Sequence, residues 1–592
     1  MICFSGLSQS RRRIFYHISR NMSKFYVRNV ENDRSLQITF EYSHTSGEKI
    51  LSRVYNASRP KSEIIDNTLT RISQNISKFI SKKLKRKLKA DGESSLSEIN
   101  IKVYKNDGIT TLEENTSTED AFQHGNVVAI ENSKFIVDIN APCCNAIVLP
   151  QTVMIGFQIC PNVEIEFASL EDSLFVWEKL KYDTSAKMGQ KDITQVPKER
   201  VELSKSLTFT PTNDEIGYRL ALTMTPRLGD REGKPMTVEC KYDVTAGPDL
   251  CPFEQRHLYT QKETGSGELR VVSYNILADV YANQEFSRNV LFNYCPPYAL
   301  DISYRKHLMI KELKGYKGDI ICLQECDYKV FIYDFVPVFE LLGFQGLMRE
   351  KGGVREGSAI FFRMSKFRLV EEHSTLLKDF METDKSCQDL VKQTYAVPAL
   401  KEMLETRSTI IHVAALEPVD RPGQILLVAN THLYFHPDFA HVRLIQTITS
   451  MRFINKLFQQ YKKQKPCLVF CGDFNSTPTR GVYEFMTTKS IKEDHDAWRS
   501  GGEDQFVAGM NFSHTFNIGS GCGLPAYTNY TNGFNGHLDY VFYDTDAFEV
   551  SQVIPQPDHK DVEFHTAIPS IVFPSDHLAQ ICDLRWKNPS HL

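Results

Sequence analysis

Hydrophobic and polar positions follow two different patterns along the chain. From residue 36 to about 250, short β-branched or alternating runs such as 35–43 and 207–226 are separated by Pro, Asn and Gly. Runs of this kind predict strands joined by turns, so we expect an antiparallel, β-rich accessory domain over residues 36–250. One stretch inside it has the spacing of an amphipathic helix. Its apolar positions are Leu69, Ile72, Ile76, Ile80, Leu84 and Leu88.

The pattern changes at Leu269. Apolar runs that end in polar residues, such as 320–327, 425–435 and 467–475, now alternate with helical stretches such as 440–463. Alternation of strand and helix predicts an α/β domain whose sheets are covered by helices, and we assign it to residues 269–592. Residues 251–268 are polar and contain Pro and Gly, which is typical of a linker.

Polar residues with chemical potential follow the strands of this second domain. Any one of them has an ordinary explanation as a turn residue, a helix cap or an ion-pair partner. Six clusters at successive strand ends are harder to explain in that way, because active sites of α/β proteins form where strand ends converge. The clusters are Asn275, Glu325, His432, Asp473 with Asn475, Asp539, and Asp576 with His577.

The residue types in these clusters suit one kind of chemistry. Carboxylate and amide oxygens are the protein ligands that Mg²⁺ prefers, and this ion keeps water molecules for a substrate phosphate. Histidine can hydrogen-bond a phosphate in either charge state. The chain has neither a Walker A sequence nor a zinc-type grouping of Cys and His. The clusters therefore favour metal-assisted hydrolysis of a phosphodiester.

The order of the motifs resembles a known family. The segments "SYNILAD", "LQECD", "NTHLYFHP", "GDFNSTP", "NGHLDYVFY" and "SDH" occur in this order from Leu269 to the C-terminus. In that order they are similar to the endonuclease/exonuclease/phosphatase superfamily, which includes deoxyribonuclease I. "YNILAD" and "TNYTNGFNGHLDYVFY" resemble its deadenylase branch, of the carbon-catabolite-repressor type. The resemblance implies an α/β two-sheet sandwich of the deoxyribonuclease I type, with helices outside.

The resemblance also implies a role for each matching residue. Glu325 is implied as the principal ligand of Mg²⁺, with Mn²⁺ as an alternative ion, and Asp473 and Asn475 as the residues that complete the metal and water site. Asp473 is further implied as the base that aligns or deprotonates the attacking water. His577 is implied to hold the scissile phosphate with Asp539 as its partner, and Asp576, His432 and Asn275 complete the polar floor. Phe534 and Pro437 match the positions that enclose an adenine, and Asn475 is a further substrate contact.

These roles imply a Mg²⁺-dependent 3′-exoribonuclease that releases AMP from poly(A) and from 2′,5′-linked oligoadenylate, so that RNA is the expected partner. One alternative is a phosphatase or phosphodiesterase of the same fold that acts on a small phosphorylated metabolite. Another is a catalytically weak RNA-binding protein. The aromatic segment "NYTNGF" favours a stacked base, because stacking contributes roughly 1–3 kcal/mol per base.

Composition adds only broad limits. The 592 residues are 41% hydrophobic and 24% charged with a net charge of −4, which is typical of a globular protein without a global basic field. No apolar run reaches the roughly 18 residues of a membrane span, so no membrane partner is expected. The 14 cysteines have no zinc-type or disulfide-type spacing, which favours reduced thiols inside a cell.

The first residues have the composition of an organelle-targeting segment. Arg11, Arg12, Arg13, Arg20, Lys24 and Arg28 all precede the first acidic residue, Glu31. A start that is rich in Arg and poor in acids is typical of mitochondrial transit peptides, although a disordered basic tail would look similar. We therefore predict a transit segment over residues 1–35 and a location in the mitochondrial matrix.

Overall fold

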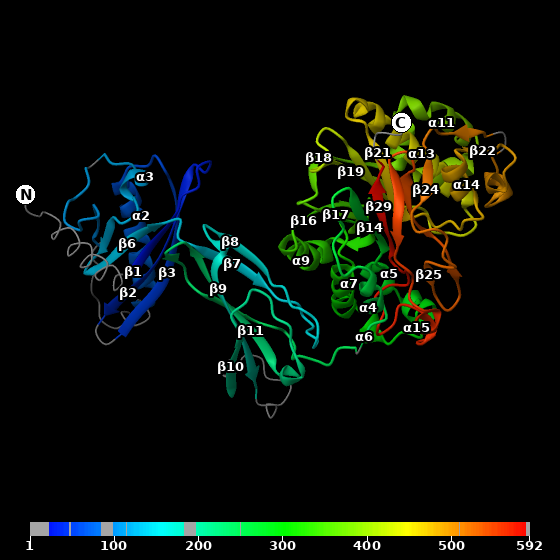
Figure 1. Ribbon diagram of the computed structural model, residues 1–592. Helices are drawn as coiled ribbons and strands as arrows, with labels where there is room; N and C mark the ends of the chain where they lie inside the picture. The colour runs from blue at the N-terminus through cyan, green and yellow to red at the C-terminus, as the bar shows by residue number, and fades with distance from the viewer. Residues whose placement is uncertain are drawn as a thin grey trace, which may run out of the picture. The chain divides into compact units, whose positions relative to one another are not determined.

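The computed structural model describes residues 23–46, 49–84, 99–113, 115–182, 197–248, 250–507 and 510–587 (Figure 1). Most of the predicted transit segment lies outside these residues. Its end, however, contains a strand, β1 (Ser23–Arg28), which pairs with two neighbours. The chain forms two compact units. Among the described residues, no helix has both the length and the apolar character needed to cross a bilayer.

The first unit is built on a six-stranded sheet in the order β3-β2-β1-β6-β5-β4. The other strands are β2 (Ser35–Ser46), β3 (Lys49–Pro60), β4 (Ile101–Tyr104), β5 (Val127–Ile130) and β6 (Ser133–Ile139). Helix α2 (Ile65–Leu84) contributes Leu69, Ile72, Ile76 and Ile80 to the core of this sheet. The amphipathic helix predicted from the spacing is thus confirmed at these four positions, Leu84 is the last residue of the helix, and Leu88 lies outside the described residues.

The expectation of an entirely antiparallel accessory domain is wrong in one respect. Strand β1 pairs with β6 in parallel, and the long connection between them contains the four strands β2 to β5 together with α2 and the short helix α3 (Thr118–Ala121). A five-stranded sheet follows in the sequence, with β10-β9-β11-β12 in order and β13 against β11. Its strands are β9 (Ser169–Lys181), β10 (Glu199–Ser204), β11 (Arg219–Leu228), β12 (Arg231–Glu232) and β13 (Met236–Glu239), and a two-stranded ribbon joins β7 (Cys143–Val148) to β8 (Asn162–Glu166).

The α/β domain that follows Leu269 contains two six-stranded sheets, as the α/β two-sheet sandwich requires. The first sheet is β16 (Phe344–Glu350), β17 (Glu356–Arg363), β15 (Ile320–Asp327), β14 (Glu268–Asn275), β29 (Gln580–Trp586) and β28 (Phe548–Val553). The second is β18 (Phe367–Leu376), β19 (Ile410–Pro418), β20 (Leu426–His432), β21 (Cys467–Asp473), β27 (Asp539–Asp544) and β24 (Ile518–Ser520).

Alternate residues of each strand face either the other sheet or a helix layer. Leu269, Val271, Leu426 and Val428 lie in one core that contains residues of both sheets. On the outer faces, α7 (Ile302–Tyr316) shares a core with the first sheet, and α13 (Ala440–Gln460) with α14 (Gly481–Thr488) shares one with the second (Figure 1). Both faces of each sheet are therefore apolar, which explains the continuous hydrophobic runs in the sequence.

Strand direction brings the polar clusters to one end of the sandwich. Strands β14 and β15 run parallel in the first sheet, and β20 and β21 run parallel in the second. Their carboxyl ends carry Asn275, Glu325, His432 and Asp473, respectively. Strand β27 runs antiparallel to β21 and begins where β21 ends, with Asp539 opposite Asp473.

Residues 251–268 are not a free linker. They contain α4 (Phe253–Arg256), and Arg256 is only 2% exposed. Its guanidinium donates to the backbone carbonyls of Pro555 and Ala579 and to the hydroxyl of Tyr316. The composition misled the prediction, because a short segment held by long-range hydrogen bonds is as polar as a solvated linker.

Candidate active site

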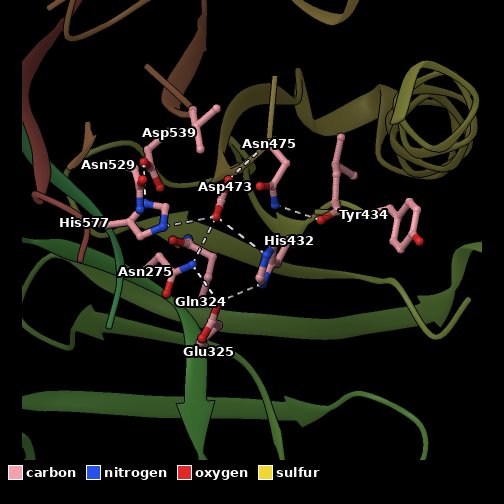
Figure 2. Close-up of polar contacts among 12 residues, drawn as sticks. Asn275, Gln324, Glu325, His432, Tyr434, Asp473, Asn475, Asn529, Asp539 and His577 are labelled. Carbon is pink, nitrogen blue, oxygen red and sulfur yellow. Dashed lines mark hydrogen bonds and ion pairs between the residues drawn. The ribbon is translucent and has the colours of Figure 1, made fainter. Parts of the chain in front are cut away.

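An amide from the first sheet joins two carboxylates from different sheets. The Nδ2 atom of Asn275 lies 3.0 Å from Oε1 of Glu325 and 3.0 Å from Oδ2 of Asp473, and it donates to both (Figure 2). The Oδ1 atom of Asn275 accepts from the backbone N–H of Leu277 at 3.0 Å, which fixes the orientation of the amide. The two acidic residues are thereby held together although about 150 residues separate them in the sequence.

Glu325 reaches this position through an irregularity in its strand. The pairing of β15 with β17 shifts register between Leu323 and Cys326, and Glu325 has a left-handed backbone with φ of 54°. A bulge of this kind redirects a side chain at the edge of an active site. The Oε2 atom of Glu325 accepts from the backbone N–H of Ala278 at 3.0 Å. Burial, together with the charges of Asp576 and Glu356, raises the pKa of Glu325 to about 7.

Asp473 lies at the centre of the cluster. Its Oδ1 accepts from the backbone N–H of Asn475 at 2.9 Å. Its Oδ2 lies 3.6 Å from Nε2 of His432 and 3.7 Å from Nε2 of His577. Burial and the neighbouring charge of Asp539 raise the pKa of Asp473 to about 7. Two buried carboxylates with raised pKa values mark a place where negative charge lacks full compensation.

Asp539 and His577 form a buried pair. Nδ1 of His577 lies 2.8 Å from Oδ2 of Asp539, and the hydroxyl of Thr528 donates to the same oxygen at 2.5 Å. Burial alone would lower the pKa of His577, but Asp539, Asp576 and Asp473 outweigh it and hold this pKa well above its ordinary value. The imidazole is therefore charged at neutral pH, with Nε2 directed toward Asp473 and available to an anionic group.

His432 differs from His577 in charge. Burial, with the nearby charges of Lys351 and His577, keeps the pKa of His432 well below its ordinary value. Its Nδ1 lies 3.1 Å from Nζ of Lys351 and 3.9 Å from Oε1 of Glu325. The cluster thus combines a neutral and a charged imidazole on either side of Asp473, one suited to accept a hydrogen bond and one to donate.

The residues present fit a divalent cation. Ligand atoms of Asp473, Asp539 and His577 lie within 4.8 Å of one another, and all three residues are buried; the carboxylates of Asp473 and Asp539 can bind a cation, whereas the charged imidazole of His577 cannot. Among the described atoms, Oδ1 of Asp539 is buried without a hydrogen-bond partner. With Glu325 joined to Asp473 through Asn275, the donor set is mainly carboxylate oxygen, which suits a hard cation. A cation here would compensate the charge that raises the two carboxylate pKa values.

The structure brings together all the predicted residues of the strand ends. Asp576 is half-buried, and its Oδ2 accepts from Nδ2 of Asn529 at 3.2 Å. Asn475 has a left-handed backbone with φ of 49° and donates from Nδ2 to the carbonyl of Leu433 at 3.0 Å. The Oδ1 atom of Asn475 takes no part in this hydrogen bond. Phe474, between Asp473 and Asn475, is fully buried in the core beneath α13 and α14.

The two predicted base-contacting residues lie on loops. Phe534 is 47% exposed and belongs to the turn between β25 (Asn529–Tyr530) and β26 (Asn535–Gly536). Pro437 is exposed, and its carbonyl accepts from Nη2 of Arg443 at 2.9 Å. Both side chains are accessible to a ligand. Their pairing around an adenine stays a prediction.

The sequence analysis did not identify Lys351, the positively charged side chain of the site. Lys351 contacts His432, as described above, and its Nζ also lies 3.0 Å from Oε1 of Glu356, which is fully buried. The hydroxyl of Tyr281 donates to the same oxygen at 2.8 Å. Lys351 belongs to the charged segment "REKGGVRE" between two strands, where nothing in the sequence distinguishes it from a solvated turn lysine.

Comparison with known proteins agrees with this geometry. Residues 272–577 match the Endonuclease/Exonuclease/phosphatase family, and residues 141–245 match the 2′,5′-phosphodiesterase 12-like N-terminal domain. The chain is 39% identical over 593 residues to 2′,5′-phosphodiesterase 12 of Homo sapiens, covering 96% of this chain and 94% of the relative. It is 38% identical over 590 residues to the protein of the same name from Rattus norvegicus, covering 96% and 95%.

A more distant relative matches only part of the chain. This relative is the CCR4-Not complex 3′-5′-exoribonuclease subunit Ccr4 of Schizosaccharomyces pombe, 29% identical over 350 residues that cover 54% of this chain and 49% of the relative. The full-length similarity and the matched family range agree with the two sheets and the converging strand ends. The chain therefore belongs to the endonuclease/exonuclease/phosphatase family and is a phosphodiesterase of the kind that carries a 2′,5′-phosphodiesterase 12-like N-terminal domain.

Proposed function

We propose that this phosphodiesterase is a 3′-exoribonuclease that releases AMP from 2′,5′-linked oligoadenylate and from poly(A). The observation that carries the proposal is the bridge from Asn275 to Glu325 and Asp473, which faces the charged His577. Buried acids beside a charged imidazole suit a reaction in which water attacks a phosphate and negative charge builds up.

A divalent cation, Mg²⁺ or Mn²⁺, is part of the proposal. Glu325 would be its principal ligand, and Asp473 and Asn475 would complete the site. When bound, the cation supplies charge stabilisation to the phosphoryl oxygens during hydrolysis.

The side chains of the protein have the other roles in the reaction. Asp473 accepts a hydrogen bond from the attacking water and orients it, because its buried carboxylate lies at the centre of the site, between Nε2 of His432 and Nε2 of His577. His577, kept charged by Asp539, donates from Nε2 to a non-bridging oxygen of the scissile phosphate. Asn275 fixes the two carboxylates, and Lys351 adds a positive charge next to His432.

Two observations support an adenylate RNA as the substrate. Two relatives that match nearly the full length of the chain carry the name 2′,5′-phosphodiesterase 12, and the S. pombe relative is named as a 3′-5′-exoribonuclease. The exposed ring of Phe534 offers a stacking surface, and stacking discriminates only weakly among bases of similar area. Because a purine offers more stacking area than a pyrimidine, stacking alone would favour adenine over uracil, without hydrogen bonds that recognise the base.

A substrate panel tests the proposal. Purified protein is incubated with 2′,5′-linked triadenylate, oligo(A), oligo(U) and NADPH, each with Mg²⁺ and with EDTA. We expect AMP from both adenylates with Mg²⁺, slower reaction on oligo(U), and no product with EDTA. Cleavage of NADPH alone would favour a metabolite phosphatase, and binding of oligo(A) without product would favour an RNA-binding protein.

We also propose that the protein resides in the mitochondrial matrix. The support is the run of basic residues before Glu31. Residues 1–40 fused to a fluorescent reporter should enter mitochondria, and the fusion with Arg11, Arg12 and Arg13 replaced by Gln should enter less. A diffuse signal from the unmodified fusion would contradict this location.

A further inference from the structure

A buried amide lies between the two sheets, behind the carboxylates of the site. Asn430 is fully buried on β20, two residues before His432. Leu426 and Val428 of the same strand lie in the core between the sheets. Because alternate residues of a strand share a face, Asn430 belongs to this inner face and is a polar residue in an otherwise apolar row.

Its amide crosses from one sheet to the other. Nδ2 of Asn430 donates to the carbonyl of Leu323 on β15 at 2.9 Å and to the carbonyl of Ala359 on β17 at 3.1 Å. Oδ1 of Asn430 accepts from Nε2 of Gln324 at 2.8 Å. Both N–H groups and the carbonyl are thus used, and all three bonds end on the opposite sheet.

The three bonds end at the bulge that presents Glu325. Leu323 and Ala359 form the last regular pair of β15 with β17 before the register shift. Gln324 follows Leu323, and Glu325 follows Gln324 with its left-handed φ of 54°. A non-glycine residue in this conformation persists only where the surroundings determine it, and Asn430 supplies such surroundings.

We propose that Asn430 is a positioning residue for the carboxylate of Glu325. It clamps the two residues that precede Glu325 and thereby holds the bulge in the form that directs the carboxylate to Asn275. Loss of the amide would leave two buried carbonyls without this donor, and the bulge could then relax toward regular pairing. The inference rests on the proposed function only in that Glu325 is taken to hold the cation.

Asn430→Ala tests the proposal. We measure kcat and KM on bis(p-nitrophenyl) phosphate and on 2′,5′-linked triadenylate at saturating Mn²⁺, well below the melting temperature of each variant. We also measure the Mn²⁺ concentration that gives half of the metal-induced thermal shift, in the absence of substrate. We expect kcat and the apparent Mn²⁺ affinity to fall about 10- to 100-fold, as for other residues that orient a ligand, with a smaller change in KM.

Thr431→Val is the matched control. Thr431 is the next residue of β20, is fully buried, and donates from Oγ1 to the carbonyl of Ile410 at 2.8 Å within its own sheet. This variant loses a buried hydrogen bond of the same strand without touching β15. It should lower the melting temperature while leaving kcat and Mn²⁺ affinity close to the wild-type values. Equal effects of Thr431→Val and Asn430→Ala on these two quantities would overturn the proposal.

Gln324→Met provides a second variant if Asn430→Ala does not fold. It keeps most of the side-chain volume and removes the amide that donates to Asn430. We expect kcat and Mn²⁺ affinity to fall in this variant too, but by a smaller factor than in Asn430→Ala. If both single variants fold, the double variant should lose less kcat than the product of the two single fold-losses, because both residues act through one hydrogen-bond network. Wild-type Mn²⁺ affinity and kcat in Gln324→Met would also overturn the proposal.

The two hypotheses can fail separately. Wild-type protein that cleaves bis(p-nitrophenyl) phosphate but neither adenylate would contradict the proposed substrate while leaving the Asn430 comparison intact. Activity of wild-type protein on adenylates, combined with unchanged Mn²⁺ affinity and kcat in Asn430→Ala, would contradict the positioning role alone.

Discussion

At the scale of single residues, Asn275 accounts for most of the geometry of the site. One side-chain amide can donate two hydrogen bonds, and here both reach carboxylates that would otherwise repel each other. The pKa values of Glu325 and Asp473 remain raised to about 7, so this amide and the neighbouring charges do not compensate the buried acids completely. A site with this residual charge is prepared for a cation.

Glu325→Gln should separate activity from stability. The change removes a proposed metal ligand but retains the size of the side chain, so kcat/KM should fall about 100-fold or more, which is several kcal/mol of charge stabilisation. In EDTA near pH 8, the melting temperature should stay close to the wild-type value, because removal of a buried charge offsets the loss of one of the two hydrogen bonds that the carboxylate accepts. Near-normal turnover at limiting Mg²⁺ would show that Glu325 is not the ligand.

Phe534→Ala should narrow the base preference. The ring is 47% exposed, so its loss removes stacking area without opening a core cavity. Stacking of roughly 1–3 kcal/mol predicts a drop in kcat/KM on oligo(A) of about 5- to 150-fold, with a smaller drop on oligo(U). A thermal melt serves as the control. An equal fractional loss on both substrates, with a lower melting temperature, would identify Phe534 as a structural residue.

At the scale of elements, a buried acid on α7 connects helix and sheet. Glu312 is 1% exposed and accepts from the hydroxyls of Tyr316 at 2.5 Å and Tyr274 at 3.1 Å. Burial raises its pKa to about 7 from an ordinary value of 4.5, against the opposing effects of both tyrosines and Arg256. The folded state therefore holds this proton more tightly than the unfolded state does.

Glu312→Gln should change how stability depends on pH. The stabilisation from the protonated carboxyl is complete below pH 4.5 and is lost as the pH rises to about 7, which costs up to about 3 kcal/mol. Glutamine cannot ionise, so the variant should melt higher than wild type at pH 8 and close to it at pH 4.5. Other acids titrate in the same range, so the difference between variant and wild type is the quantity to follow. Glu340→Gln, on the exposed face of α9 (Val336–Leu341), is the control for the chemical change itself.

At the scale of the whole molecule, the catalytic unit begins earlier than its first strand. Phe253 is fully buried and Arg256 almost so, and the latter donates to carbonyls close to β28 and β29. These contacts tie the segment before β14 to the last strands of the chain. The two ends of the catalytic unit are thus held together by side-chain hydrogen bonds as well as by the pairing of β14 with β29.

Two truncations test this boundary. Chains of residues 251–592 and 269–592 both lack residues 1–250, so they differ only in residues 251–268, the segment that contains α4. The shorter chain loses the guanidinium bonds of Arg256, each worth about 1.5–3 kcal/mol when buried. We expect it to melt at a clearly lower temperature or to precipitate, whereas equal melting temperatures would mean that the segment does not stabilise the unit.

The α/β class of the second domain and the strands that carry the chemistry were predictable from the apolar pattern, and the resemblance to a known family implied the two-sheet arrangement. Continuous apolar runs followed by polar residues predicted β14, β15, β20 and β21 together with their terminal residues, because burial on both faces leaves a strong local signature. Family motifs then identified which polar ends belong to one site.

Contacts between residues that are distant in the sequence are visible only in the folded structure. Lys351 reaches His432 from a turn, Arg256 anchors a segment that has the composition of a linker, and Asn430 crosses between sheets to the bulge before Glu325. None of these contacts leaves a local pattern, because a lysine in a turn, an arginine in a polar segment and an asparagine in a strand have the same sequence environment whether paired or solvated. Long-range hydrogen bonds are set by how strands and sheets pack, and that information is distributed over the whole chain.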